Sequence, residues 1–128
     1  MKSQKKHLSD LHFEHQLWQS EAKFFADELK IYQNRLDEIA SKNTGSEISK
    51  KISHFQNQFI IQKEQLDILN HEVKIHEQSL AKFAQENPIA IEHRLFEDHS
   101  AMQDKLQTFK KIYSELKTEF TQFVAESL

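Results

Sequence analysis

Three of the eight histidines lie where their side chains could bind a metal ion together. His15, His76 and His99 each interrupt a row of apolar residues that recurs at alternating three- and four-residue spacing. Such a row is typical of the buried side of a long helix. Neutral imidazole nitrogens are good ligands for Zn²⁺ and also suit copper, nickel and iron. If the fold brings the three rings together, we expect a site for Zn²⁺ or another divalent transition metal.

Other chemistry is sparse in this sequence. The chain has no Cys, which excludes disulfides, thiolate metal sites and thiol catalysis. It also lacks the glycine-rich phosphate loops, the serine-nucleophile motif and the zinc-protease motif. Its 17 basic and 20 acidic residues are interspersed and give a net charge of −3, so no basic patch is available for nucleic acid. We therefore expect no nucleic-acid binding, and any catalysis would have to use the histidines.

The composition predicts an all-α fold. The 128 residues include one Gly and one Pro, too few for the turns of a β-sandwich or barrel. The remainder is rich in Glu, Gln, Lys, Leu and Ile, which favours helices, and ten Phe can build a core. We predict one domain over residues 1–128.

Two breaks divide this domain into helices at about 7–42, 47–86 and 88–126. At the first break we expect Gly45 to take a positive φ and Ser46 to cap the next helix. Asn87-Pro88 marks the second break, because proline disfavours the helical conformation of the residue before it. Short connections make neighbouring helices antiparallel, which predicts an elongated antiparallel three-helix bundle with heptad packing. Alternatively, Pro88 could kink one very long helix that needs a partner to cover its apolar row.

The two turns also predict which residues share a layer of the bundle. Residues that face each other across an antiparallel hairpin have a constant sum of residue numbers, and each turn fixes that sum. Without using the histidines, this rule places His15, His76 and His99 in one layer. It places Gln62 and Tyr113 in another, where we expect them to hydrogen-bond with each other.

The histidine layer has three interpretations. As a metal site it would have His12, one turn before His15, as a candidate fourth ligand. Glu72 and Asp98 would accept hydrogen bonds from the ring N–H groups and orient the ligands. As a polar layer without metal, the rings would bond with one another and fix the register of the helices. As a catalytic site, a bound zinc would activate water for hydrolysis.

The first two predicted helices carry further apolar residues at seven-residue spacing, outside the buried rows. The corresponding positions of the third helix are mostly polar. An exposed apolar patch usually marks an interface, so we predict a homodimer through the face formed by the first two helices. A helix of another protein is the alternative partner, and an unusually wide core face would explain the pattern without a partner. The predicted interface residues are Leu17, Phe24, Ile31, Ile61, Ile68 and Ile75.

No apolar run of 18 residues occurs, so we expect no membrane insertion. The charged residues 1–6 are not followed by an apolar segment, and we expect no signal peptide and a cytoplasmic location. The leading functional prediction is a non-enzymatic helical interaction or scaffold module whose histidine layer binds a transition metal or acts as a polar layer. The alternatives are a zinc-dependent, hydrolase-like enzyme and a plain coiled-coil adaptor without any site.

Overall fold

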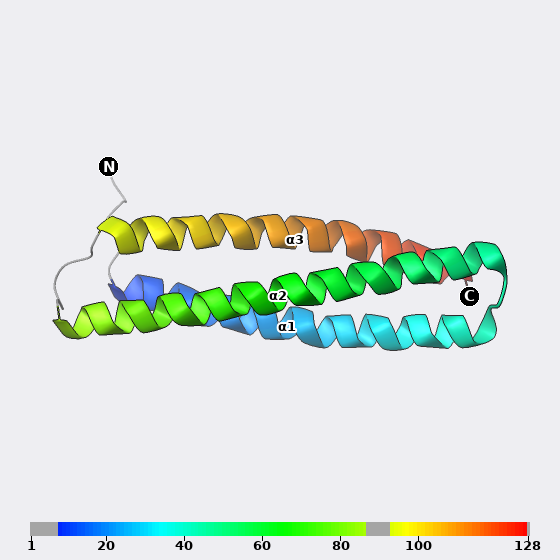
Figure 1. Ribbon diagram of the computed structural model, residues 1–128, viewed down its shortest axis with the longest axis horizontal. Coiled ribbons are helices and arrows are strands. Elements are labelled where there is room, and N and C mark those ends of the chain that lie inside the picture. Colours follow the sequence, from blue (N-terminus) through cyan, green and yellow to red (C-terminus); the bar gives the residue numbers. More distant parts are fainter. Residues whose placement is uncertain (1–7, 87–92, 128) are drawn as a thin grey trace.

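The computed structural model describes residues 8–86 and 93–127, which form three long helices. These are α1 (Leu8–Lys42), α2 (Ser46–Glu86) and α3 (His93–Ser127). The helices lie side by side in an elongated arrangement, and each runs opposite to the one before it in the chain (Figure 1). The all-α prediction is confirmed, and because α3 returns along α2 the chain is not one kinked helix. The predicted turn at Asn87-Pro88 lies outside the described residues.

The turn between α1 and α2 differs in detail from the prediction. Gly45 does not adopt a left-handed backbone, and a Cβ there would meet only the side chain of Ile48, at an ordinary 3.8 Å. Its carbonyl instead accepts a hydrogen bond from the Ser49 N–H at 3.0 Å, so Gly45, and not Ser46, is the N-cap of α2. On the other side, the Asn43 side-chain amide donates to the Ile39 carbonyl at 2.9 Å and satisfies the end of α1.

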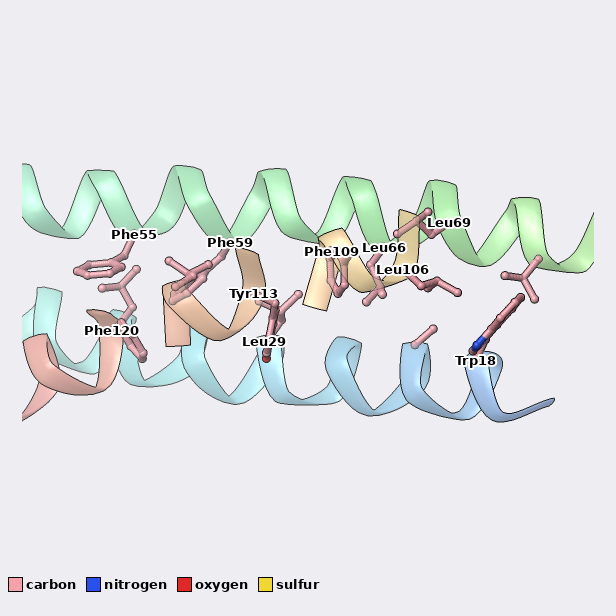
Figure 2. Packing of buried hydrophobic residues seen from close by; sticks show 14 of the residues in the cluster. Trp18, Leu29, Phe55, Phe59, Leu66, Leu69, Leu106, Phe109, Tyr113 and Phe120 are labelled. Atoms are coloured by element: carbon pink, nitrogen blue, oxygen red, sulfur yellow. The ribbon is translucent and has the colours of Figure 1, made fainter. Parts of the chain in front are cut away.

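The core consists of the predicted apolar rows: each buried side chain in the described residues belongs to one of them. Aromatic rings fill one half, where Phe120 contacts Phe55 and Phe59 with ring centroids 5.3 and 5.0 Å apart. Successive layers continue from these rings to Trp18 (Figure 2). A second, smaller cluster of Leu11, Leu80 and Leu95 lies beyond. The histidine layer separates the two clusters.

Ion pairs fix the position of α3 on α1. The Lys110 ammonium lies 2.6 Å from the Glu21 carboxylate, and Lys117 lies 3.2 Å from Glu28. Both pairs join residues at seven-residue spacing, so one edge of α1 runs along one edge of α3. Within the described ranges, no helix is both long and apolar enough to cross a membrane.

Candidate metal centre

His15, His76 and His99 meet in one layer, as predicted, with one ring contributed by each helix. Ring centroids are separated by 4.8 Å (His15–His76), 5.1 Å (His15–His99) and 5.7 Å (His76–His99). The residues are 1%, 8% and 3% exposed in sequence order. One nitrogen from each ring lies within 4.8 Å of the other two, so the three form a group that could hold a metal ion.

Carboxylates bind the outward nitrogens of two of these rings. Nδ1 of His15 donates to Oε1 of Glu77 at 2.6 Å, and Nε2 of His99 donates to Oε1 of Glu14. Both glutamate side chains are about a quarter exposed, at 25% and 28%. A histidine ligand in a metal site commonly donates its other ring N–H to a carboxylate in this way, which fixes the ring and its tautomer.

The inward nitrogens of these two rings face each other. Nε2 of His15 lies 3.2 Å from Nδ1 of His99. In the neutral tautomer that donates its N–H to the carboxylate, each ring carries a lone pair on its inward nitrogen. Two lone pairs this close repel each other unless a proton or a metal ion lies between them. Two nitrogen ligands of a tetrahedral Zn²⁺ stand about 3.3 Å apart, which agrees with the observed separation.

The third ring, that of His76, contributes a further nitrogen to the group. Nε2 of His76 is buried and has no hydrogen-bond partner in the part of the chain that the structure describes. Burial lowers the pKa of His76, and protonation of His15 or His99 would lower it further, which favours the neutral ring. An unsatisfied buried polar atom costs about 1–3 kcal/mol. The nitrogen separations reach up to 4.8 Å, about 1.5 Å more than in a tetrahedral Zn²⁺ site.

Apolar groups enclose the triad along the bundle axis. Trp18 stacks on His99, with centroids 4.6 Å apart and planes at 25°, and its ring centroid lies 5.5 Å from that of His15. The Leu11 cluster covers the opposite side. Three grooves of the described chain, two between α2 and α3 and one between α1 and α2, are lined by residues other than the triad. This enclosure suits a bound ion better than a substrate.

The other predicted site residues lie outside the triad. Nδ1 of His12 is 2.6 Å from the second carboxylate oxygen of Glu77, and its side chain is 51% exposed. Glu72, which we expected to orient a ring, instead accepts a hydrogen bond from Lys105 at 3.2 Å. Asp98 is exposed, and its charge partly opposes the lowering of the His76 pKa by burial. Glu14 and Glu77, which were not among the predicted residues, bind two of the rings instead.

A charge pattern in the sequence could have identified Glu14 and Glu77. A third helix can lie on either side of an antiparallel hairpin, and that choice decides which edge of each helix faces which neighbour. The glutamates of α1 and the lysines of α3 recur at seven-residue spacing and can pair on only one of the two sides. That side brings Glu14 next to His99 and turns Glu77 towards α1. The acidic edge of α1 continues through Glu14, Glu21 and Glu28, and its α3 partners are His99, Lys110, Tyr113 and Lys117.

The predicted bond between Gln62 and Tyr113 is wrong. The Tyr113 hydroxyl donates to Oε1 of Glu28 at 2.6 Å, and Lys117 donates to the other oxygen of Glu28. Burial and this bond to Glu28 raise the pKa of Tyr113, and burial raises that of Tyr32. The Gln62 amide is left in the core without a hydrogen bond to any described residue, and it lines a groove between α2 and α3.

The predicted interface residues do not form one face. All six are between 45% and 65% exposed. On α1, Phe24 lies one turn from both Glu21 and Glu28, which contact α3, so its row borders one side of α3. On α2, Ile61 and Ile68 line the groove on the other side of α3. The two rows are therefore separate surfaces. The sequence pattern could not predict this separation, because it does not reveal on which side of the hairpin α3 lies.

Comparisons with protein-family models, with curated proteins and with solved structures find no match to this chain. The triad and the surfaces of the three helices are therefore the features that indicate a function.

Proposed function

We propose that this protein is a non-enzymatic helical module that binds one divalent transition metal ion, foremost Zn²⁺, through His15, His76 and His99. The observation that carries this proposal is the set of inward ring nitrogens. Two of them face each other at 3.2 Å with their outward N–H groups held by carboxylates, and the third is buried without a partner. A single cation accepts all three lone pairs.

Charge supports a divalent ion at this position. Glu14 and Glu77 place two carboxylates next to the rings. A divalent cation between the rings balances these two charges, which favours its transfer from water into the interior. The ligand type leaves the choice among zinc, copper, nickel and iron to coordination geometry and supply.

The position of the triad favours a structural role for the ion. It joins all three helices where the bundle is otherwise held by the small Leu11, Leu80 and Leu95 cluster. With three protein ligands a fourth position remains, as in catalytic zinc sites. Apolar layers above and below oppose the access that a hydrolase needs, and we therefore rank that alternative lower. A polar layer in which His15 and His99 share a proton is the second candidate, because their 3.2 Å separation also suits an N–H···N bond.

The experiment is a metal titration of protein purified without an affinity tag and freed of metal with a chelator. We expect one Zn²⁺ per chain in competition with a chromophoric chelator, and tetrahedral absorption bands with Co²⁺. His99→Leu should weaken binding at least 100-fold. His71→Leu is the matched control, because His71 is an exposed histidine of α2.

Each outcome separates the interpretations. A folded wild-type protein that binds no metal would leave only the polar layer. Binding that survives replacement of all three triad histidines would place the metal elsewhere. Loss of binding in His99→Leu with retained helicity, and full binding in His71→Leu, is the result that the proposal requires.

A further inference from the structure

The triad is closed along the bundle axis, so a metal ion has to reach it from the side. Trp18 stacks on His99 on one side of the layer, and the Leu11, Leu80 and Leu95 cluster lies on the other. The remaining routes are the three seams, the lines along which two neighbouring helices meet. An ion that crosses a seam gives up water ligands, and donor atoms on its route make this loss less unfavourable.

The seam between α1 and α2 has a continuous row of donor atoms from the surface to the triad. The Glu77 carboxylate of α2 binds two histidines of α1: Oε2 lies 2.6 Å from Nδ1 of His12, and Oε1 lies 2.6 Å from Nδ1 of His15. The exposed fraction of the side chain falls from 51% at His12 to 25% at Glu77 and 1% at His15. Two hydrogen bonds therefore connect a solvent-exposed ring with a buried ring of the triad.

His12 and Glu77 have ligand atoms of the kinds that Zn²⁺ binds, an imidazole nitrogen and a carboxylate oxygen. In the neutral tautomer in which His12 donates from Nδ1 to Glu77, its Nε2 carries a lone pair. Lys74, the nearest basic residue of α2, is exposed, and Glu77 is bonded to the two histidines instead. Two protein ligands hold an ion less tightly than three. The pair therefore suits a transient position from which the ion moves on.

The other two seams suit an ion less well. At the seam between α1 and α3, Glu14 binds His99, and Trp18 stacks on the same ring. At the seam between α2 and α3, two basic and two acidic side chains line the groove nearest to the triad: Lys82, Arg94, Glu86 and Asp98. The basic groups of that groove repel a cation and offset the attraction of its carboxylates.

We propose that Zn²⁺ enters and leaves the triad across the seam between α1 and α2, by way of His12 and Glu77. This inference rests on the proposed function, because it concerns the route to the same site. His12 and Glu77 bind the ion first, and Glu77 then releases His15 and lets the ion pass to the inward nitrogens. His12 is not a ligand of the final site. Since one route serves both directions, loss of the His12 imidazole slows binding and release by the same factor and leaves the dissociation constant unchanged.

The experiment is a stopped-flow measurement of Zn²⁺ exchange with the full chain. Binding is followed as the metal-free protein takes Zn²⁺ from a chromophoric chelator, and release as excess chelator removes it. His12→Gln keeps a side-chain N–H that can donate to Glu77 but removes the imidazole. Both rates should fall about tenfold, while the dissociation constant stays at the wild-type value. His54→Gln is the matched control, because His54 is an exposed histidine near the start of α2, and it should exchange at the wild-type rate.

The outcomes separate the route from the site. If the wild type binds no Zn²⁺, the proposed function and the route both fail. If it binds Zn²⁺ and His12→Gln exchanges at the wild-type rate, only the route fails. A weaker affinity of His12→Gln caused by faster release would mean that His12 only holds Glu77 in place, and it would also overturn the route.

Asp98→Asn tests the competing seam between α2 and α3. It should exchange Zn²⁺ at the wild-type rate, and circular dichroism confirms that each variant is folded. Slower exchange in Asp98→Asn, together with wild-type exchange in His12→Gln, would move the route to that seam and overturn the proposal.

Discussion

Two polar layers interrupt the apolar core, and they use the same device for different results. In one, His99 of α3 donates to Glu14 of α1. In the other, Tyr113 of α3 donates to Glu28 of α1. The donor and the acceptor of the second layer each lie fourteen residues, or two seven-residue repeats, after those of the first. A glutamate at the edge of α1 thus satisfies a buried donor of α3 in each case.

The difference lies in the number of polar atoms on the buried side chain. A phenol has one oxygen, and Glu28 satisfies it at the edge of the bundle. An imidazole has two nitrogens, and when Glu14 binds one of them the other points inward to His15. The same carboxylate therefore completes the tyrosine but prepares the histidine as a ligand. We therefore predict that the histidine layer binds metal and that the tyrosine layer contributes only to stability.

The largest expected effect is stabilisation by metal. Zn²⁺ at about 100 times its dissociation constant should add about 2.7 kcal/mol to the free energy of unfolding. For a domain of this size, that raises the melting temperature by about 10 °C, and a strong chelator should reverse it. Tyr113→Phe should keep this response and His99→Leu should lose it. If both variants respond equally in a thermal melt, the two layers do not differ as described.

The carboxylates give the next largest effect. Glu77→Gln and Glu14→Gln each replace the carboxylate that orients a ring by a neutral amide. Each substitution should weaken Zn²⁺ binding about 10- to 100-fold. Glu28→Gln changes the same edge of α1 but serves Tyr113, so its affinity should equal that of wild type. A competitive chelator titration measures all three. Equal losses in Glu14→Gln and Glu28→Gln would show that only the overall charge of the edge matters.

The contrast between these glutamates also shows what the sequence could predict. The spacing of apolar residues and the positions of two turns were enough to place His15, His76 and His99 in one layer, because helix period and turn position fix the register of a hairpin. They were not enough to find Glu77, since its contact depends on the side on which α3 packs. Local competition explains the error at Tyr113, whose hydroxyl reaches the nearby charged Glu28 instead of the neutral Gln62. A hydrogen bond to a charged group is the stronger of the two.

In chelator, the two layers should respond to apolar substitution with opposite signs. His76→Leu removes a buried nitrogen that has no partner among the described residues, and it should raise the free energy of unfolding by about 1 kcal/mol. Tyr113→Phe removes a satisfied hydrogen bond and should lower it by about 1 kcal/mol. Urea denaturation at neutral pH measures both. A destabilised His76→Leu protein would mean that the His76 ring packs better than leucine and that its nitrogen does not destabilise the metal-free protein.

The smallest effect at neutral pH concerns the tyrosines, and it appears only in alkali. Burial raises the folded pKa of Tyr113, with a further contribution from its bond to Glu28, and burial also raises that of Tyr32; these are the two tyrosines of the chain. In the unfolded chain a tyrosine loses its proton near pH 10. A raised folded pKa means that the folded state holds the proton longer, so stability is unaffected below about pH 10 and falls as the pH rises beyond it. The phenolate absorption band should therefore appear together with the loss of helicity and not before it. In Tyr113→Phe the fall above pH 10 should be less steep, because one of the two linked groups is gone. A phenolate band that develops near pH 10 while circular dichroism still shows intact helices would mean that solvent reaches the Tyr113–Glu28 bond. In that case the bond to Glu28 would not protect the tyrosine layer, and the proposed difference from the histidine layer would be wrong.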